Sequence, residues 1–246
     1  MSASVEPRAE YDPSHFAWIH DAEERHFWFR ARGEIIASLM ASLISTYPNA
    51  PDVLEVGCGS GNVLRDLAKL PRGRFFGMDL FSEGFTTARR RSPAPLLQAD
   101  LHRPPFRRDF DLVCLFDVLE HIEEDVDVLV DLAKMLRPGG RLVLTVPAHP
   151  ALWSYADELA HHVRRYTASG LSETITRAGL QVEYLTPFMA CLLPLMSIGR
   201  LLNARRAGER PDKGEHDHLR RINQDPADGL GEINHDRHRD ELRQEL

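Results

Sequence analysis

Short apolar runs alternate with helical patterns along residues 32–147. Over residues 32–44, isoleucine, leucine and methionine recur every three or four residues, which predicts an amphipathic helix. Buried strands are predicted at residues 52–56, 74–79, 95–100, 110–116 and 141–147. The segments between them predict helices at residues 62–70, before Arg91, and at residues 123–136, where Arg-Pro-Gly-Gly ends the helix. This alternation predicts an α/β fold: a doubly wound, Rossmann-like, mostly parallel sheet with helices on both faces.

The pattern changes in the last third of the chain. Residues 169–180 predict a helix, and residues 181–188 predict a sixth strand. Residues 189–206 are strongly apolar but too short, and too broken by proline, to span a bilayer. They favour a helical cap over the binding site, with a dimer surface or a membrane-interface segment as alternatives. Residues 207–246 mix charges of both signs, which is typical of a polar tail.

Composition and charge narrow the classes of partner. The net charge of −7 gives no reason to expect nucleic acid, because phosphate binding needs clustered lysine and arginine. The three cysteines form no C-x-x-C pair, so neither a disulfide framework nor a zinc cage is predicted, and a reducing, cytoplasmic location is favoured. The first residues lack the apolar core of a secretory signal. The histidines of the tail have no scaffold around them, and no metal site is expected.

Three glycines, Gly57, Gly59 and Gly61, separate the first predicted strand from the helix that follows it. Glycine at these positions lets the backbone approach a ligand at a helix N-terminus without a Cβ in the way. A dinucleotide site would have glycine at position 62, where this chain has Asn62. The spacing is therefore G-x-G-x-G, which disfavours a dinucleotide.

Two acidic residues near the loop indicate the kind of ligand. Glu55 would repel a pyrophosphate but suits a ligand that carries an ammonium and a sulfonium group. Asp79, at the tip of the second predicted strand, can accept hydrogen bonds from both hydroxyls of a ribose, and it would serve a nicotinamide cofactor equally well. Asp79 therefore indicates a ligand with a nucleoside, and Glu55 indicates that this ligand carries positive charge instead of a pyrophosphate.

Five segments carry a resemblance to a known family: VLEVGCGSGN, GMDL, QADLHRPPF, FDLVCLFDVLEHI and LRPGGRLVLTVPAH. In this order and spacing they resemble the class I S-adenosylmethionine-dependent methyltransferases, over about residues 20–188. The flanking HFWFRARGEII and PALWSYADELAHHVRRYT are similar to a bacterial subgroup associated with sugar, lipid-linked or natural-product pathways. The resemblance implies an enzyme that transfers a methyl group from S-adenosylmethionine to a small-molecule acceptor, with oxygen slightly favoured as the accepting atom.

Together, the residue pattern and the resemblance predict how the chain is organised. We expect an N-terminal helical cap at residues 1–50, a cofactor-binding domain at 51–188, the apolar helical cap at 189–206 and the polar tail at 207–246. Members of the family usually end with an antiparallel seventh strand, and no apolar run that could form it is evident here. A peripheral membrane contact or a lipid-linked acceptor stays open, and the sequence sets no oligomeric state.

The family's cofactor-binding positions are carried over one by one. The loop and Glu55 would hold the methionine moiety of the cofactor. The ends of the second and third strands would contact the ribose and the adenine, and the end of the fourth strand would border the transfer channel. An arginine of FWFRAR, Arg30 or else Arg32, would pair with the cofactor carboxylate. The set comprises Glu55, Gly57, Gly59, Gly61, Met78, Asp79, Leu80, Asp100, Leu101, Phe116, Asp117 and Arg30.

The acceptor side is expected after the fourth and fifth strands. His121 and His149 are the candidate general bases, although a structural role for His121 is equally open. The segment DELAHHVRRYT, at residues 157–167, supplies arginines and a tyrosine that would suit an anionic or carbohydrate-bearing acceptor. The alternative is a lid held by its own salt bridges.

Two other functions stay open at this point. One is an NAD(P)-dependent oxidoreductase on the related Rossmann sheet, which Glu55 and Asn62 disfavour. The other is a non-catalytic, methyltransferase-like binding subunit, which the divergent tail permits.

Overall fold

A five-stranded parallel sheet forms the centre of the part that the computed structural model describes, residue 23 and residues 26–187. The strand order is β3-β2-β1-β4-β5, and every neighbouring pair is parallel. The strands are β1 (Asp52–Val56), β2 (Arg74–Asp79), β3 (Leu96–Gln98), β4 (Phe110–Phe116) and β5 (Leu136–Thr145). This order, with β1 in the middle, confirms the predicted doubly wound sheet.

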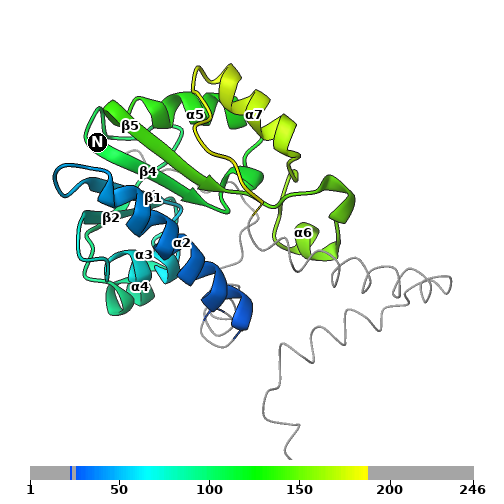
Figure 1. Cartoon of the computed structure of the whole chain (residues 1–246). Coiled ribbons are helices and arrows are strands. Elements are labelled where there is room, and N and C mark those ends of the chain that lie inside the picture. Colours follow the sequence, from blue (N-terminus) through cyan, green and yellow to red (C-terminus); the bar gives the residue numbers. More distant parts are fainter. Residues whose placement is uncertain (1–22, 24–25, 188–246) are drawn as a thin grey trace, which may run out of the picture. The chain divides into compact units, whose positions relative to one another are not determined.

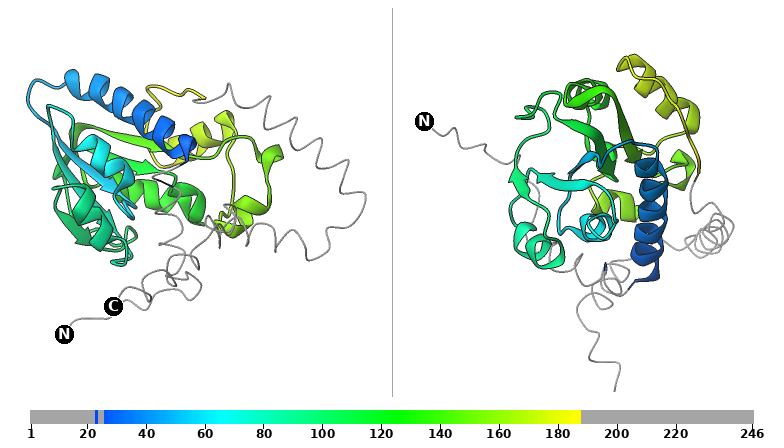
Figure 2. Two further views of the ribbon diagram at one scale, coloured as in Figure 1. Left: turned by 90° about the horizontal axis from the view of Figure 1, so that it is seen from below. Right: turned by 60° about the vertical axis from the view of Figure 1, so that its left-hand side comes forward.

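Helices cover both faces of the sheet. The α-helices are α2 (Phe27–Ser45), α3 (Asn62–Leu67), α4 (Phe85–Arg91), α5 (Asp125–Ala133), α6 (Tyr155–Leu159) and α7 (Ala168–Arg177). Two short 3-10 helices are η1 (Leu119–His121) and η2 (Pro150–Leu152). Figure 2 shows the long helix α2, in blue, lying along one face.

The sheet separates two apolar cores, because successive strand residues face opposite ways. Leu54 of β1 packs in the core that holds α5 and α7, whereas its neighbour Val53 packs in the core that holds α2, α3 and α4. Helix α2 buries the stripe Ile36, Met40 and Ile44 in the second core. A helix that buries one stripe in this way is fixed in rotation against the sheet.

The start of β5 differs from the prediction. Helix α5 ends at Ala133, and Arg-Pro-Gly-Gly at residues 137–140 lies inside β5 as an irregularity instead of ending the helix. Phe110 pairs with Leu136 and Leu112 pairs with Arg141 on either side of it. The physical reason is that the carbonyl of Met135, two residues after the helix, already accepts backbone hydrogen bonds from the chain that enters β4.

Residues 181–187 form no strand, so the prediction of a sixth strand at residues 181–188 is wrong where the structure describes it. Val182, Tyr184 and Leu185 stay exposed, and Glu183 pairs with Arg141 Nε at 2.8 Å. An alternating pattern records a preference for extended backbone, but a strand also needs side-chain packing against neighbours, which these residues lack.

Within the described residues, none of the helices combines the length and the apolarity needed to cross a membrane. The predicted apolar cap at 189–206 and the polar tail at 207–246 lie outside the described residues, as do residues 1–22 of the N-terminal cap.

Candidate functional site

The predicted site residues gather at the carboxyl ends of the parallel strands. In Figure 1 the arrowheads of β4 and β5 point toward the side of the sheet on which α6 lies. The glycine loop leaves β1 at this edge, Asp79 ends β2, and Asp117 directly follows β4. Ligands of doubly wound sheets bind at this edge.

Hydrogen bonds to β2 hold the glycine loop in place. The N–H of Gly57 donates to the Met78 carbonyl at 2.8 Å. The N–H of Gly59 donates to Asp79 Oδ2 at 2.7 Å, and the N–H of Phe81 donates to Asp79 Oδ1 at 2.9 Å. Burial nevertheless raises the pKa of Asp79. A carboxylate offers about four lone-pair sites, so Asp79 can still accept a hydrogen bond from a ligand.

The three glycines of the loop serve different needs. Gly57 has φ of 74°, and a Cβ there would lie 2.4 Å from Val118 Cγ2. Gly61 also has φ of 74°, and a Cβ would lie 2.9 Å from Ala88 Cβ. A Cβ on Gly59 would meet nothing within 4 Å. Gly57 and Gly61 are therefore required by the protein's own packing, whereas Gly59 borders open space that a ligand can enter.

Glu55 is a buried carboxyl group beside the loop. Its residue is 3% exposed, and its Oε2 has no hydrogen-bond partner within the described residues. Burial raises its pKa to about 8, against the opposing effect of the Arg32 guanidinium. A buried acceptor without a donor costs free energy, so this oxygen has an unmet need for a donor or a cation.

Arg32 lies opposite, on helix α2. Its Nη2 pairs with Asp117 Oδ2 at 2.7 Å. Its Nε is buried and has no hydrogen-bond partner in the part of the chain described. Arg30, the first of the two arginines expected here, is exposed on the same helix. The geometry therefore favours Arg32 over Arg30 as the arginine of the site.

Asp117 is held by two elements. Its backbone is left-handed, with φ of 58°, which is uncommon for a residue with a side chain. Its Oδ1 accepts a hydrogen bond from Thr145 Oγ1 at 2.7 Å, and its N–H donates to the Thr145 carbonyl at 3.0 Å. Phe116, just before it, is buried in the core beneath α2. Backbone strain of this kind occurs at sites where a side chain must be aimed.

The residues expected near an adenine are less closely tied to the loop. The side chain of Met78 is fully buried in the core, so only its carbonyl reaches the loop. Leu80 and Leu101 are half-buried. Asp100 Oδ1 accepts a hydrogen bond from the N–H of His102 at 2.9 Å, which closes a local turn.

A network outside the predicted set ties the loop to Glu23. Ser60 Oγ donates to Glu23 Oε2 at 2.5 Å, and Arg91 Nη1 donates to the same oxygen at 2.6 Å. Arg91 also reaches Ser60 Oγ at 2.7 Å. The loop, the end of α4 and the segment before α2 are therefore joined through buried charges.

The polar segment on the acceptor side is bonded to itself. Arg165 Nε donates to Asp157 Oδ1 at 2.6 Å. Arg164 Nη1 and the Tyr166 hydroxyl donate to Asp125 Oδ2 at 2.8 and 2.9 Å. Burial alone would raise the pKa of Asp157, but its hydrogen bonds lower it to about 2. These contacts favour the alternative of a segment held by its own ion pairs.

The two candidate bases lie in different surroundings. His121, in η1, follows Glu120, a fully buried residue whose pKa burial raises to about 9. The rings of His121 and His162 make an edge contact at 4.8 Å. Desolvation is the larger cause, and the nearby His162 the smaller one, of a lowering of the pKa of His121 to about 4. The residue as a whole is nevertheless exposed. His149 is exposed, with a left-handed φ of 60°, at the start of η2.

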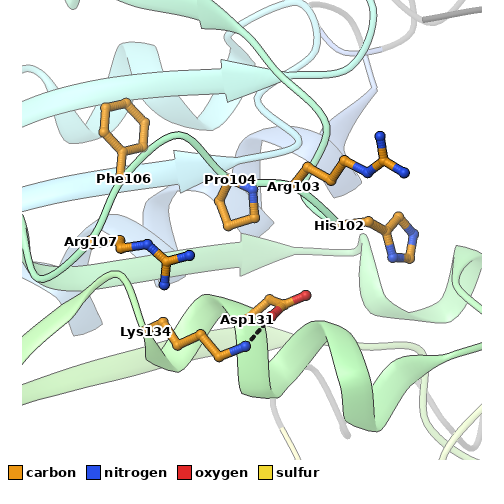
Figure 3. Close-up of a pocket in the computed structure, with 7 residues that line it drawn as sticks. All are labelled: His102, Arg103, Pro104, Phe106, Arg107, Asp131 and Lys134. Carbon is orange, nitrogen blue, oxygen red and sulfur yellow. Dashed lines mark hydrogen bonds and ion pairs between the residues drawn. The ribbon is translucent and has the colours of Figure 1, made fainter.

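A cavity of about 290 Å³ lies away from these residues (Figure 3). It opens between the loop after β3 and helix α5, and Lys134 pairs there with Asp131 at 2.6 Å. Its walls are His102, Arg103, Pro104, Phe106, Arg107, Asp131 and Lys134. Because none of the predicted site residues lines it, this cavity is not part of the site.

Comparisons with known proteins agree with the geometry. Residues 54–144 match the family model described as a methyltransferase domain. The chain is 28% identical over 169 residues to a probable S-adenosylmethionine-dependent methyltransferase of Mycolicibacterium smegmatis, covering 65% of this chain and 62% of that protein. It is 29% identical over 157 residues to a ubiquinone biosynthesis O-methyltransferase of Xanthomonas axonopodis pv. citri, covering 55% of this chain and 65% of that protein. The chain thus spans less than two thirds of the length of these relatives.

A solved structure shares the fold. Magnesium protoporphyrin IX methyltransferase from Synechocystis PCC 6803, with bound SAH, superposes with a TM-score of 0.56. The identity is 16%, and the match covers 70% of this chain and 86% of that one.

Proposed function

We propose that the chain is a class I S-adenosylmethionine-dependent methyltransferase, which transfers a methyl group from S-adenosylmethionine to a small-molecule acceptor. One observation carries the proposal: an unpartnered acceptor, Glu55 Oε2, and an unpartnered donor, Arg32 Nε, are both buried within the described residues. The amino-acid end of S-adenosylmethionine supplies the matching groups, an ammonium for Glu55 and a carboxylate for Arg32. A nicotinamide dinucleotide has no such pair.

The remaining cofactor contacts follow from the strand ends. We infer that Asp79 accepts hydrogen bonds from the ribose hydroxyls, and that the open space beside Gly59 admits the ligand. Asp100 and the N–H of Leu101 would meet the adenine, with Leu80 beside it. Arg32 would replace Arg30 in the contact with the carboxylate, because Arg30 is exposed.

S-adenosylmethionine brings a methyl group on a sulfonium, a leaving group that needs no acid. The protein's part is then alignment and exclusion of water, with a base where the acceptor must lose a proton. His121 and His149 are the candidates for this base, since they follow the ends of β4 and β5. Asp117, held by Arg32 and Thr145, would border the path between donor and acceptor.

Oxygen is the acceptor atom that we favour. The support is the supply of histidines next to the site and a relative that is named as an O-methyltransferase. The acceptor belongs to the sugar, lipid-linked or natural-product classes that the flanking segments suggest.

The proposal is tested by calorimetric titration of the full chain with S-adenosylmethionine, S-adenosylhomocysteine and NAD in parallel. We expect binding of both sulfur ligands at micromolar concentrations, no heat with NAD, and a higher melting temperature with the bound ligands. Binding of NAD alone would favour the oxidoreductase. Binding of none of the three would favour the non-catalytic subunit.

The assignment of the base is tested separately, with an oxygen acceptor found by screening. His121→Ala and His149→Ala are compared at saturating cofactor. We expect turnover to fall by about 100-fold in the variant that lacks the base, and much less in the other. Full turnover in both would exclude both histidines.

A further inference from the structure

Three side chains near the carboxyl end of β4 could hold a metal ion. Glu120 and His121 lie in η1, and His162 comes from the segment after α6. One ligand atom from each of the three lies within 4.8 Å of the others. His162 Nε2 is 3.9 Å from Glu120 Oε1. The three ligand atoms are therefore close enough together for small side-chain movements to bring them around one ion.

The buried carboxyl of Glu120 needs an explanation. The residue is fully buried, and within the described residues neither Oε1 nor Oε2 has a hydrogen-bond partner. Isolated carboxylates in such surroundings are strongly disfavoured, and buried charges are normally paired or bound to a metal. The backbone carbonyl of Glu120 accepts from the N–H of Val163 at 2.8 Å, so the segment with His162 is fixed against η1.

The ring of His162 is oriented by a hydrogen bond at Nδ1, the nitrogen that would not bind the metal. Its Nδ1 lies 3.0 Å from Asp157 Oδ1. Asp157 is fixed in turn by Arg165 and by Ser154, whose N–H donates to it at 2.8 Å. A carboxylate on one ring nitrogen sets the tautomer and leaves the other nitrogen, Nε2, free to bind a metal. Nε2 is the atom that faces Glu120.

We propose that Glu120, His121 and His162 form a binding site for one divalent transition-metal ion, with Asp157 orienting His162. Two imidazole nitrogens and one carboxylate oxygen suit zinc, iron or manganese better than calcium or magnesium. Metal–ligand bonds of about 2.0–2.2 Å place neighbouring ligand atoms about 3–3.5 Å apart. Side-chain rotations that move each ligand atom by about 1 Å would therefore complete the site. Three protein ligands leave coordination positions open.

The open positions give the site a role that rests on the proposed function. An acceptor hydroxyl bound to the metal would have a lowered pKa and would lose its proton to solvent, so that the metal-bound oxygen is held in place to accept the methyl group as the C–S bond of the sulfonium breaks. The carboxylate of Asp117, which directly follows β4, lies close enough to interact with Glu120 and adds negative charge next to the site. Glu120 and the two histidines would then act as ligands, and no separate base would be needed at His121.

The test uses the full chain, treated with a chelator and then titrated with Zn²⁺ by calorimetry, with Co²⁺ as a spectroscopic probe. We expect one tight equivalent of Zn²⁺ and a Co²⁺ absorption spectrum of low coordination number. Glu120→Gln, His121→Ala and His162→Ala should each weaken binding by about 100-fold or more, since even outer-shell changes cost about 10–100-fold. Asp157→Asn should weaken it by about 10-fold.

His102→Ala is the matched control, because His102 lies in the loop after β3 and outside the cluster. The histidines of residues 207–246 are present in every variant, so any binding they provide is common to all. Glu120 is fully buried and its variant could unfold, whereas His121 is exposed, and thermal melting identifies variants that are folded. Equal Zn²⁺ affinity in wild type, His121→Ala and His162→Ala would overturn the proposal, and so would the absence of stoichiometric binding in wild type.

Titration with S-adenosylmethionine separates this inference from the proposed function. Metal binding without binding of S-adenosylmethionine would leave the metal site and refute the methyltransferase role. Binding of S-adenosylmethionine without metal would leave the enzyme and refute the metal site, with Glu120 then a protonated, buried acid.

Discussion

Replacement of Glu55 by glutamine should stabilise the ligand-free protein against alkaline pH. Burial raises the pKa of Glu55 from 4.5 to about 8. In the unfolded chain the carboxyl ionises near its ordinary value, whereas in the folded chain it stays protonated until about pH 8. The wild-type protein therefore loses stability as the pH rises from about 4.5 to about 8, and loses no more of it above that.

The size of this loss follows from the same two values. At about 1.4 kcal/mol per pH unit, a rise of the pKa from 4.5 to about 8 corresponds to about 5 kcal/mol above pH 8. Glutamine has nearly the same shape and no charge, so Glu55→Gln should not show this loss. Its amide adds a constant cost of about 1–3 kcal/mol for a buried polar group without a partner, which does not change with pH.

The assay is urea unfolding of both proteins between about pH 5 and pH 9, with Glu173→Gln, an exposed substitution on α7, as the matched control. The difference in unfolding free energy between Glu55→Gln and wild type should grow by several kcal/mol over this range. A difference that stays constant with pH would refute the reasoning, because Glu55 would then be ionised in the folded state.

Cofactor binding should reverse the protonation of Glu55. With a pKa of about 8, the carboxyl is about nine-tenths protonated at pH 7, and contact with an ammonium would ionise it. Calorimetry in two buffers of different ionisation enthalpy should then show release of about 0.9 proton more in wild type than in Glu55→Gln. Equal proton release in the two proteins would show that Glu55 does not meet the ammonium.

Two further substitution pairs test the loop and the arginine. Gly57→Ala should lower the free energy of unfolding in urea by about 2–5 kcal/mol, because its Cβ would clash with Val118. Gly139→Ala, at a similar φ but in open space, should lower it by about 1 kcal/mol. Equal losses in the two variants would contradict the clash. Arg32→Ala should weaken S-adenosylmethionine binding by about 10–100-fold in calorimetry while Arg30→Ala leaves it unchanged, and the reverse order would restore Arg30 to the site.

The parts of the molecule that could be predicted are those that the backbone determines. The glycine loop between β1 and α3 could be predicted because its backbone shape requires glycine. The place of Asp79 could be predicted because it lies at the end of a predicted strand. The sixth strand could not be predicted reliably, since whether Val182 and Tyr184 find packing neighbours is decided by residues far away in the sequence. Glu120 gave a weak signal, a charge inside the apolar run VLEHI, but only the fold shows that it has no partner within the described residues.

The rotation of helix α2 about its axis distinguishes Arg30 from Arg32. The buried residues Ile44, Met40 and Ile36 of α2 recur every four positions, and one further step toward the N-terminus reaches Arg32. Arg30 lies two residues earlier, about 200° around the helix, so both arginines cannot face the sheet. The apolar stripe therefore fixes which side of the helix faces the sheet. A charged residue that continues this stripe faces the sheet too and is buried. A buried arginine without an internal partner for every donor, as Arg32 is within the described residues, needs an anion from outside the helix, and Asp117 supplies only part of it.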